Sequence, residues 1–94
     1  MATSRLIQWD HLTEDDQVRR VVKDSLPAEP NVADVASFTT QQRLEHSDLV
    51  DGVIYCSASA PSLLGLLPAK WLIEFKFDHE RLIGIHVEKD VTGP

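Results

Sequence analysis

The C-terminal third of the chain alternates apolar and polar residues so regularly that it leaves few choices of fold. Between residues 70 and 78 every second side chain is large and apolar, namely Trp71, Ile73, Phe75 and Phe77. The side chains between them include three charged ones, Lys70, Glu74 and Lys76. A period of two is that of a β-strand with one buried face and one solvated face. We therefore predict a strand over residues 70–78.

A second strand is predicted directly after the first. Residues 81–89 repeat the alternation after the short link 78–80. The residues expected to point inward are Ile83, Ile85 and Val87, and those expected to point outward are Gly84, His86 and Glu88. Because the link is short, the two strands are expected to pair as an antiparallel hairpin.

A third strand is predicted to begin after the turn sequence Asp51-Gly52. The stretch 53–56 is rich in β-branched and aromatic residues, which favour strands. Its alternation puts Ile54, Cys56 and Ala58 on the core face. The three strands together predict an antiparallel meander.

The N-terminal half carries helix signals. The run Thr13-Glu14-Asp15-Asp16 places a capping hydroxyl and three acids where a helix dipole is positive, which predicts a helix over residues 14–25 that Pro27 stops. Asn31 followed by Asp34 predicts the start of a second helix, running to about Arg43.

These elements predict an α+β fold, a two-layer sandwich in which an N-terminal helical hairpin packs on a three-stranded antiparallel meander. We expect one domain over residues 1–94, with a lead or short strand in 1–12, the helical hairpin in 13–44 and the sheet in 47–91. The helix residues expected to face the sheet are Val18, Val21, Val22, Val35 and Phe38.

Charge and composition exclude several classes of protein. The chain has 94 residues and a formal net charge of −6, which opposes contact with nucleic acid or with anionic lipid. It has one cysteine, so it has no internal disulfide, and no apolar run approaches the ~20 residues that span a bilayer. The sequence as it stands predicts a cytoplasmic location, or a periplasmic or envelope one if an export signal has been removed.

The pattern Trp71-x-Ile73-x-Phe75-x-Phe77-Asp78, followed by Leu82, Ile85, Val87 and the terminal Thr92-Gly93-Pro94, resembles the C-terminal hairpin of small uncharacterised bacterial proteins. The order of elements also resembles outer-membrane-assembly lipoprotein domains of the BamE/SmpA type. That resemblance covers residues 13–94 in architecture and 70–94 in motif, and it implies a non-enzymatic scaffolding role. The chain departs from it by lacking a lipid-bearing cysteine.

No set of residues with catalytic spacing is present in the sequence. Cys56 falls on the core face of its strand, where a buried structural role is expected, and no serine lies in a nucleophile-elbow motif. Pairs of histidine and acid occur at 10–11, 46–48, 78–80 and 86–88, but two ligands do not close a metal site. We therefore expect no enzymatic activity, no metal and no cofactor.

Three features are candidates for binding a partner. The leucines of the segment 61–68 (Leu63, Leu64, Leu66 and Leu67) lie in an expected connection, and either fold over the core as a helical turn or form an exposed apolar patch. The acids Glu14, Asp15 and Asp16 serve either as helix caps or as an acidic patch. The outward residues Glu74, Lys76, His86 and Glu88 form the expected exposed face of the sheet.

The sequence therefore favours a small non-catalytic protein-interaction or scaffolding domain with an unidentified protein partner. One alternative is an acidic inhibitor or antitoxin-like protein that blocks a basic or nucleic-acid-binding partner. A second is a small enzyme or metal-binding protein that uses histidine and carboxylates. Homodimerisation through an edge strand or through the leucine segment is also open.

Overall fold

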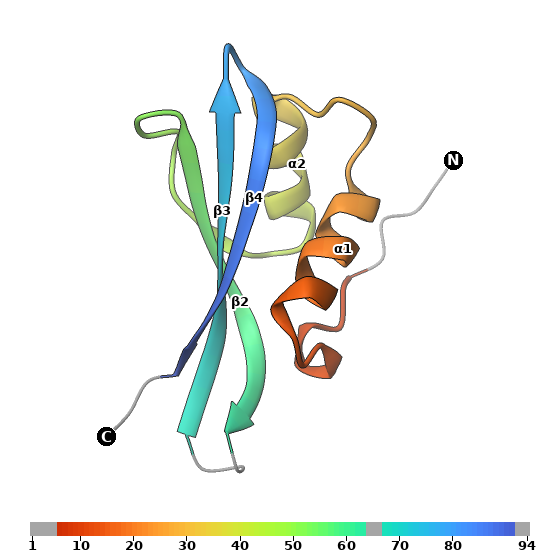
Figure 1. The fold of residues 1–94 in the computed structure, drawn as a ribbon, viewed down its shortest axis with the longest axis vertical. Helices are drawn as coiled ribbons and strands as arrows, with labels where there is room; N and C mark the ends of the chain where they lie inside the picture. The colour runs from red at the N-terminus through yellow and green to blue at the C-terminus, as the bar shows by residue number, and fades with distance from the viewer. Residues whose placement is uncertain (1–5, 64–66, 92–94) are drawn as a thin grey trace.

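The computed structural model describes residues 6–63 and 67–91, and only the backbone of residues 62, 63 and 67. It shows an antiparallel sheet with two α-helices on one of its faces (Figure 1). The elements are η1 (Trp9–His11), α1 (Asp15–Ser25), α2 (Val32–Gln41), β1 (Glu45–His46), β2 (Val53–Leu63), β3 (Leu67–Asp78) and β4 (Arg81–Val91). The strands lie in the order β1-β2-β3-β4. The α+β class and the one-sided helical layer are therefore as predicted.

Helix α1 begins one residue later than the capping analysis placed it. Its N-cap is Glu14 and not Thr13. The Gln17 side-chain oxygen accepts hydrogen bonds from the backbone N–H of Thr13 at 2.9 Å and of Glu14 at 3.0 Å. The Thr13 hydroxyl also donates to that oxygen, at 3.1 Å, so it serves as a donor and not as the expected capping acceptor.

Helix α2 is capped at its start as predicted. The Asn31 side chain accepts from the backbone N–H of Asp34 at 2.9 Å, and the Asp34 carboxylate accepts from the Asn31 N–H at 3.0 Å. The helix ends at Gln41, two residues before the predicted end. Arg43 adopts a left-handed conformation with φ of 57°, and the Leu44 N–H returns to the Thr39 carbonyl at 2.9 Å, which closes the last turn.

The core lies between the helices and the inner face of β2 and β3. The alternation predicted for these strands is confirmed, because Ile54, Cys56, Ala58, Trp71, Ile73, Phe75 and Phe77 are all buried. From the helices, Val18, Val22, Val35 and Phe38 are buried, whereas Val21 is only half buried. The Phe38 and Phe75 rings meet edge to face, with centroids 6.3 Å apart.

The predicted count of three strands is wrong, because the sheet has a fourth strand, β1. Glu45 and His46 pair with Ser57 and Cys56 across the chain reversal that precedes β2. The strand is two residues long and both residues are exposed and polar. It has no apolar alternation, so the pattern that predicts strands is absent there.

The predicted inward position of Ile83 is also wrong. Lys76 pairs with Gly84 while Phe77 pairs with Leu82, so β4 contains one extra residue at this point. Such a β-bulge reverses the alternation, which turns Leu82 toward the core and leaves Ile83 66% exposed. Beyond the bulge, Ile85 and Val87 face the core as predicted.

The leucine segment is not a simple connection. Its first residues belong to β2 and its last to β3, and the backbone of Leu63 pairs with that of Leu67. The segment therefore extends the β2–β3 hairpin on both sides, and a helical turn over 61–68 is ruled out for its described part. Leu64 and Leu66 lie outside the described residues.

The segment before α1 packs on the core without forming a strand over its described residues. Trp9 is buried in the 3₁₀-helix η1, which lies against β2. The Ile7 N–H donates to the Gln42 side-chain oxygen at 2.7 Å. From residue 6 to residue 12 the N-terminal lead therefore contains a 3₁₀-helix and no strand.

The turn between β3 and β4 holds the start of α2. His79 and Glu80 both have positive φ, as a tight two-residue hairpin turn requires. The Val32 N–H donates to the Glu80 carbonyl at 3.1 Å, and the Leu82 N–H donates to the Pro30 carbonyl at 2.9 Å. The segment 30–32 therefore lies along the outer edge of β4 at its first residues.

Candidate functional site

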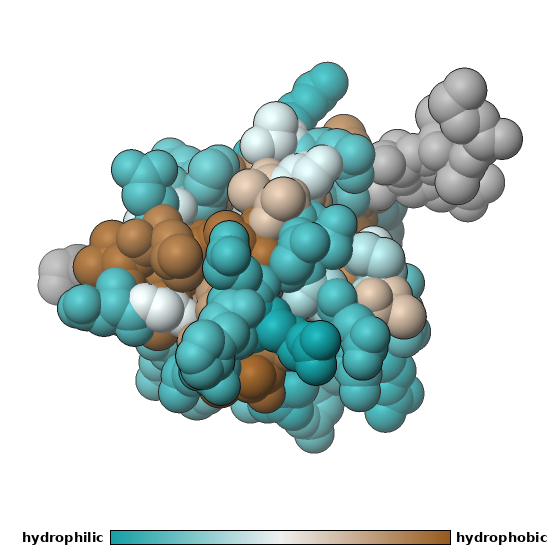
Figure 2. Space-filling model, turned by 90° about the horizontal axis from the view of Figure 1, so that it is seen from above, coloured by the Kyte–Doolittle hydropathy of each residue, from teal (hydrophilic) through white to brown (hydrophobic). Residues whose placement is uncertain are grey.

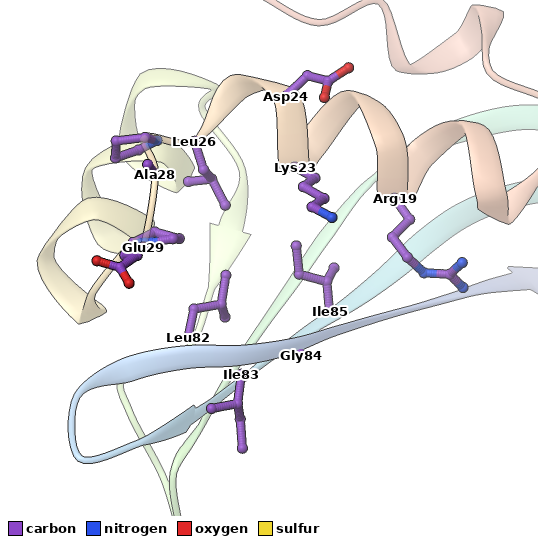
Figure 3. Close-up of a pocket in the computed structure, with 12 residues that line it drawn as sticks. Arg19, Lys23, Asp24, Leu26, Ala28, Glu29, Leu82, Ile83, Gly84 and Ile85 are labelled. Atoms are coloured by element: carbon purple, nitrogen blue, oxygen red, sulfur yellow. The ribbon is translucent and has the colours of Figure 1, made fainter.

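A groove of about 600 Å³ runs between helix α1, the α1–α2 connection and the edge strand β4. Figure 3 shows this site, which we call the α1–β4 groove. Its volume is in the range that proteins use to bind ligands. The residues that line it are Arg19, Lys23, Asp24, Leu26, Pro27, Ala28, Glu29, Pro30, Leu82, Ile83, Gly84 and Ile85.

The floor of the α1–β4 groove is apolar. Leu26, Leu82 and Ile85 are half buried and pack against the hydrophobic core, and in Figure 3 their side chains point toward one another across the groove. Gly84 adds no side chain, and no atom lies within 4 Å of the position that a Cβ would take there. The β-bulge contributes to this floor, because it turns Leu82 inward.

Two cations lie over one end of the groove. In Figure 3 the side chains of Arg19 and Lys23 extend from α1 toward β4, whereas Asp24 points away. Arg19 is paired with Asp16 at 2.7 Å, an exposed contact that contributes little stability. Among the described residues no ion pair involves Lys23. Glu29 lies at the opposite end, so the groove is positive at its α1 end and negative at its loop end.

The groove opens along a sheet edge. In the described residues β4 has a strand neighbour on one side only, which is β3. Its other edge is bonded by the segment 30–32 as far as Leu82, and no further backbone bond on that edge is found among the residues the structure describes. An unpaired strand edge offers a row of backbone donors and acceptors to a partner.

The acids that the sequence singled out do not line this groove, and of the leucines only the backbone of Leu63 and Leu67 is described. Glu14, Asp15 and Asp16 are exposed at the start of α1, where they complement the helix dipole, and the Asp16 carboxylate accepts from the Arg19 guanidinium. Leu63 and Leu67 lie at the far ends of β2 and β3. A role in partner binding stays a prediction for both groups.

The residues predicted to form an exposed sheet face share the face that the helices leave uncovered. Lys76, His86 and Glu88 are exposed and Glu74 is half buried. Glu74 lies between Tyr55 on β2 and His86 on β4 in the strand register. Their binding of a partner also stays a prediction.

A further apolar area lies at the end of the molecule that carries the β3–β4 turn. In Figure 2, which views this end, apolar surface gathers on the left, the side on which Figure 1 shows the loop between β1 and β2. Leu49 and Val50 of that loop are 44% and 51% exposed. The two side chains are adjacent in sequence and form a small convex area, without the walls of a groove.

Cys56 is buried, as the alternation predicted. Burial raises the pKa of its thiol to about 12, which suppresses the thiolate that nucleophilic chemistry needs. No cluster of three or more potential metal ligands occurs among the described residues. Neither observation supports a chemical reaction in the groove.

Sequence reasoning missed the α1–β4 groove. Its one signal was Gly84, a glycine inside a strand pattern, which often marks a bulge or a close backbone approach. A second hollow of about 410 Å³, between η1, the end of α2 and strands β1 to β3, was missed as well. It is bordered by Trp9, Arg43 and Lys70.

Comparison with protein-family models, with curated proteins and with solved structures finds no match for this chain. None of the described helices is both long and apolar enough to cross a bilayer.

Proposed function

We propose that this protein is a non-catalytic protein-interaction domain that binds its partner in the α1–β4 groove. The observation that carries the proposal is an apolar floor, made by Leu26, Leu82 and Ile85, beside a strand edge that is unpaired beyond Leu82 in the described residues. A bound polypeptide can cover the apolar floor with its side chains and hydrogen-bond the free strand edge with its backbone.

The shape of the groove favours a protein partner over an enclosed small molecule. The walls are α1 on one side and β4 on the other, and the site is open along its length. Most small-molecule sites enclose the larger part of their ligand. A polypeptide, by contrast, can lie along an open groove and continue beyond both ends.

Site-specific photocrosslinking in the source cells tests this proposal. A diazirine amino acid replaces Ala28, which is exposed on the wall of the groove. In a matched variant it replaces Ser59, which is exposed on β2 beside the second hollow and away from the groove. We expect one discrete protein adduct from position 28 and none from position 59. The adduct should disappear when Lys23→Glu is added, because that change reverses the charge over the groove.

An adduct from position 59 alone, or equal adducts from both positions, would assign partner binding to another surface. Circular dichroism of each variant shows whether the fold is intact. The two substituted residues are small and exposed, so neither replacement disturbs the core.

A further inference from the structure

We infer that the occupant of the α1–β4 groove is an extended peptide segment that adds to β4 as a further strand and carries an acidic side chain toward Lys23 and Arg19. The inference rests on the proposed function and names the partner's chemistry. It follows from three observations on the edge strand, the helical layer and the charges.

The first observation is that strand addition has already begun in the free protein. The segment 30–32 bonds to β4 from outside, through Leu82 N–H to the Pro30 carbonyl and Val32 N–H to the Glu80 carbonyl. The chain then leaves β4 to enter α2. Beyond Leu82 and the bulge at Ile83, the edge has no bonded neighbour among the described residues. A peptide at that position would satisfy backbone groups already aimed outward.

The second observation is that α1 packs against β4 and leaves an apolar groove open between them. Leu26 and Ile85 of the apolar floor are only half buried, so this part of the floor is left open to a partner. Neighbouring strands lie about 4.8 Å apart, and alternate side chains of an added strand point to one face. Those side chains would enter the groove and cover its floor.

The third observation is charge. Lys23 extends over the groove and makes no ion pair with a described residue, and Arg19 lies beside it on α1. The whole chain carries a net charge of −6, so this positive end stands out from an acidic protein. An acidic side chain on the groove face of the peptide would pair with these cations, whereas a basic one would be repelled.

A second copy of this chain is a poorer occupant. If two β4 strands paired antiparallel about Val87, Lys89 of one copy would lie opposite Ile85 of the other and on the same face. A third cation would then approach Lys23 and Arg19, which is unfavourable. In that register the charge of the groove therefore disfavours a second copy.

The test uses defined peptides and the full chain. The probe is an acetylated, amidated heptapeptide in which glutamate at position 2 and valines at positions 4 and 6 share one face, with threonine elsewhere. A second probe has lysine in place of the glutamate. Two further probes are N-methylated on one or the other alternate set of amides, because only one set faces β4 in an added strand. Binding is followed by NMR of backbone amides and of the Ile and Leu methyl groups.

We expect the glutamate probe to shift the signals of Leu82, Ile85 and the β4 amides, and the lysine probe to bind about tenfold more weakly. One N-methylated probe should lose binding and the other should keep it. Lys23→Glu should reverse the preference between glutamate and lysine, whereas Lys76→Glu, on the uncovered face, should not.

Other outcomes overturn the inference in distinguishable ways. If both N-methylated probes bind equally, or if no probe shifts the groove while the crosslink at position 28 persists, the groove binds its partner but not as an acidic strand. If crosslinking at position 28 fails as well, the proposed function fails too. If light scattering shows a dimer that the probes do not displace, the edge belongs to a second copy.

Discussion

Strands β3 and β4 share one sequence pattern but differ in structure. In β3 the alternation from Trp71 to Phe77 is kept without interruption, whereas in β4 it breaks at Ile83. β3 is hydrogen-bonded to a strand on each side, but β4 has one strand neighbour among the described residues. An edge strand can accept an extra residue because it has to keep its register with one strand only. In this protein, alternation therefore predicts which side chains are buried more reliably for the central strand β3 than for the edge strand β4.

The largest expected effect is on the buried face of the central strand β3. Phe75 is fully buried and its ring meets that of Phe38, so Phe75→Ala should lower the free energy of unfolding by about 3–5 kcal/mol. Lys76→Ala, the next residue, should stay within about 0.5 kcal/mol because its side chain is exposed. Chemical denaturation of both variants measures the difference. Equal losses would mean that the two faces of β3 are not distinct.

The next prediction concerns pH and Cys56, which lies opposite Ile73 in the same covered region. Burial raises the pKa of this thiol from 9.0 to about 12, so the unfolded chain releases the proton first as the pH rises. The stability that this group contributes is complete below pH 9 and is lost between about 9 and 12, at about 1.4 kcal/mol for each pH unit. Denaturation across this range, compared with Cys56→Ala, isolates the thiol. A parallel loss in the variant would refute the assignment.

The smallest effects test the bulge in β4. Ile83→Ser should change the free energy of unfolding by no more than about 0.5 kcal/mol, because this side chain is largely exposed. Ile85→Ser should cost about 1–2 kcal/mol, because Ile85 packs against the core. Thermal or chemical unfolding of the pair reports the difference. A greater loss of stability for Ile83→Ser than for Ile85→Ser would mean that Ile83 faces the core, as the alternation in the sequence predicts.

Most of the fold follows from local patterns that can be recognised in the sequence. The caps at Asn31 and Asp34, the break at Pro27 and the alternation through Phe75 each act within a few residues, so they predict α1, α2 and β3 closely. β1 was missed because two polar residues pair only through the proximity of β2. The bulge at Ile83 was missed because its effect appears in the register with β3 and not in β4 alone.

The candidate site was hardly predictable at all. Its floor and walls come from Lys23 and Leu26 in the first half of the chain and from Leu82 and Ile85 in the second. Their proximity depends on how α1 packs against β4, which no local pattern encodes. The residues that the sequence favoured, such as Asp15 and Leu63, were noticed because they are locally unusual, and that property does not report on tertiary contacts.

The bond between the β3–β4 turn and the start of α2 has a consequence for how the chain folds during synthesis. Asn31 and Arg81 meet although they are fifty positions apart, and α1 packs against β4. The helical half therefore leaves the ribosome well before the strand that anchors it exists. Contacts of such wide sequence separation slow folding, because the loop between them must close first. The two layers can pack on each other only after β4, the last of the described elements, has been synthesised.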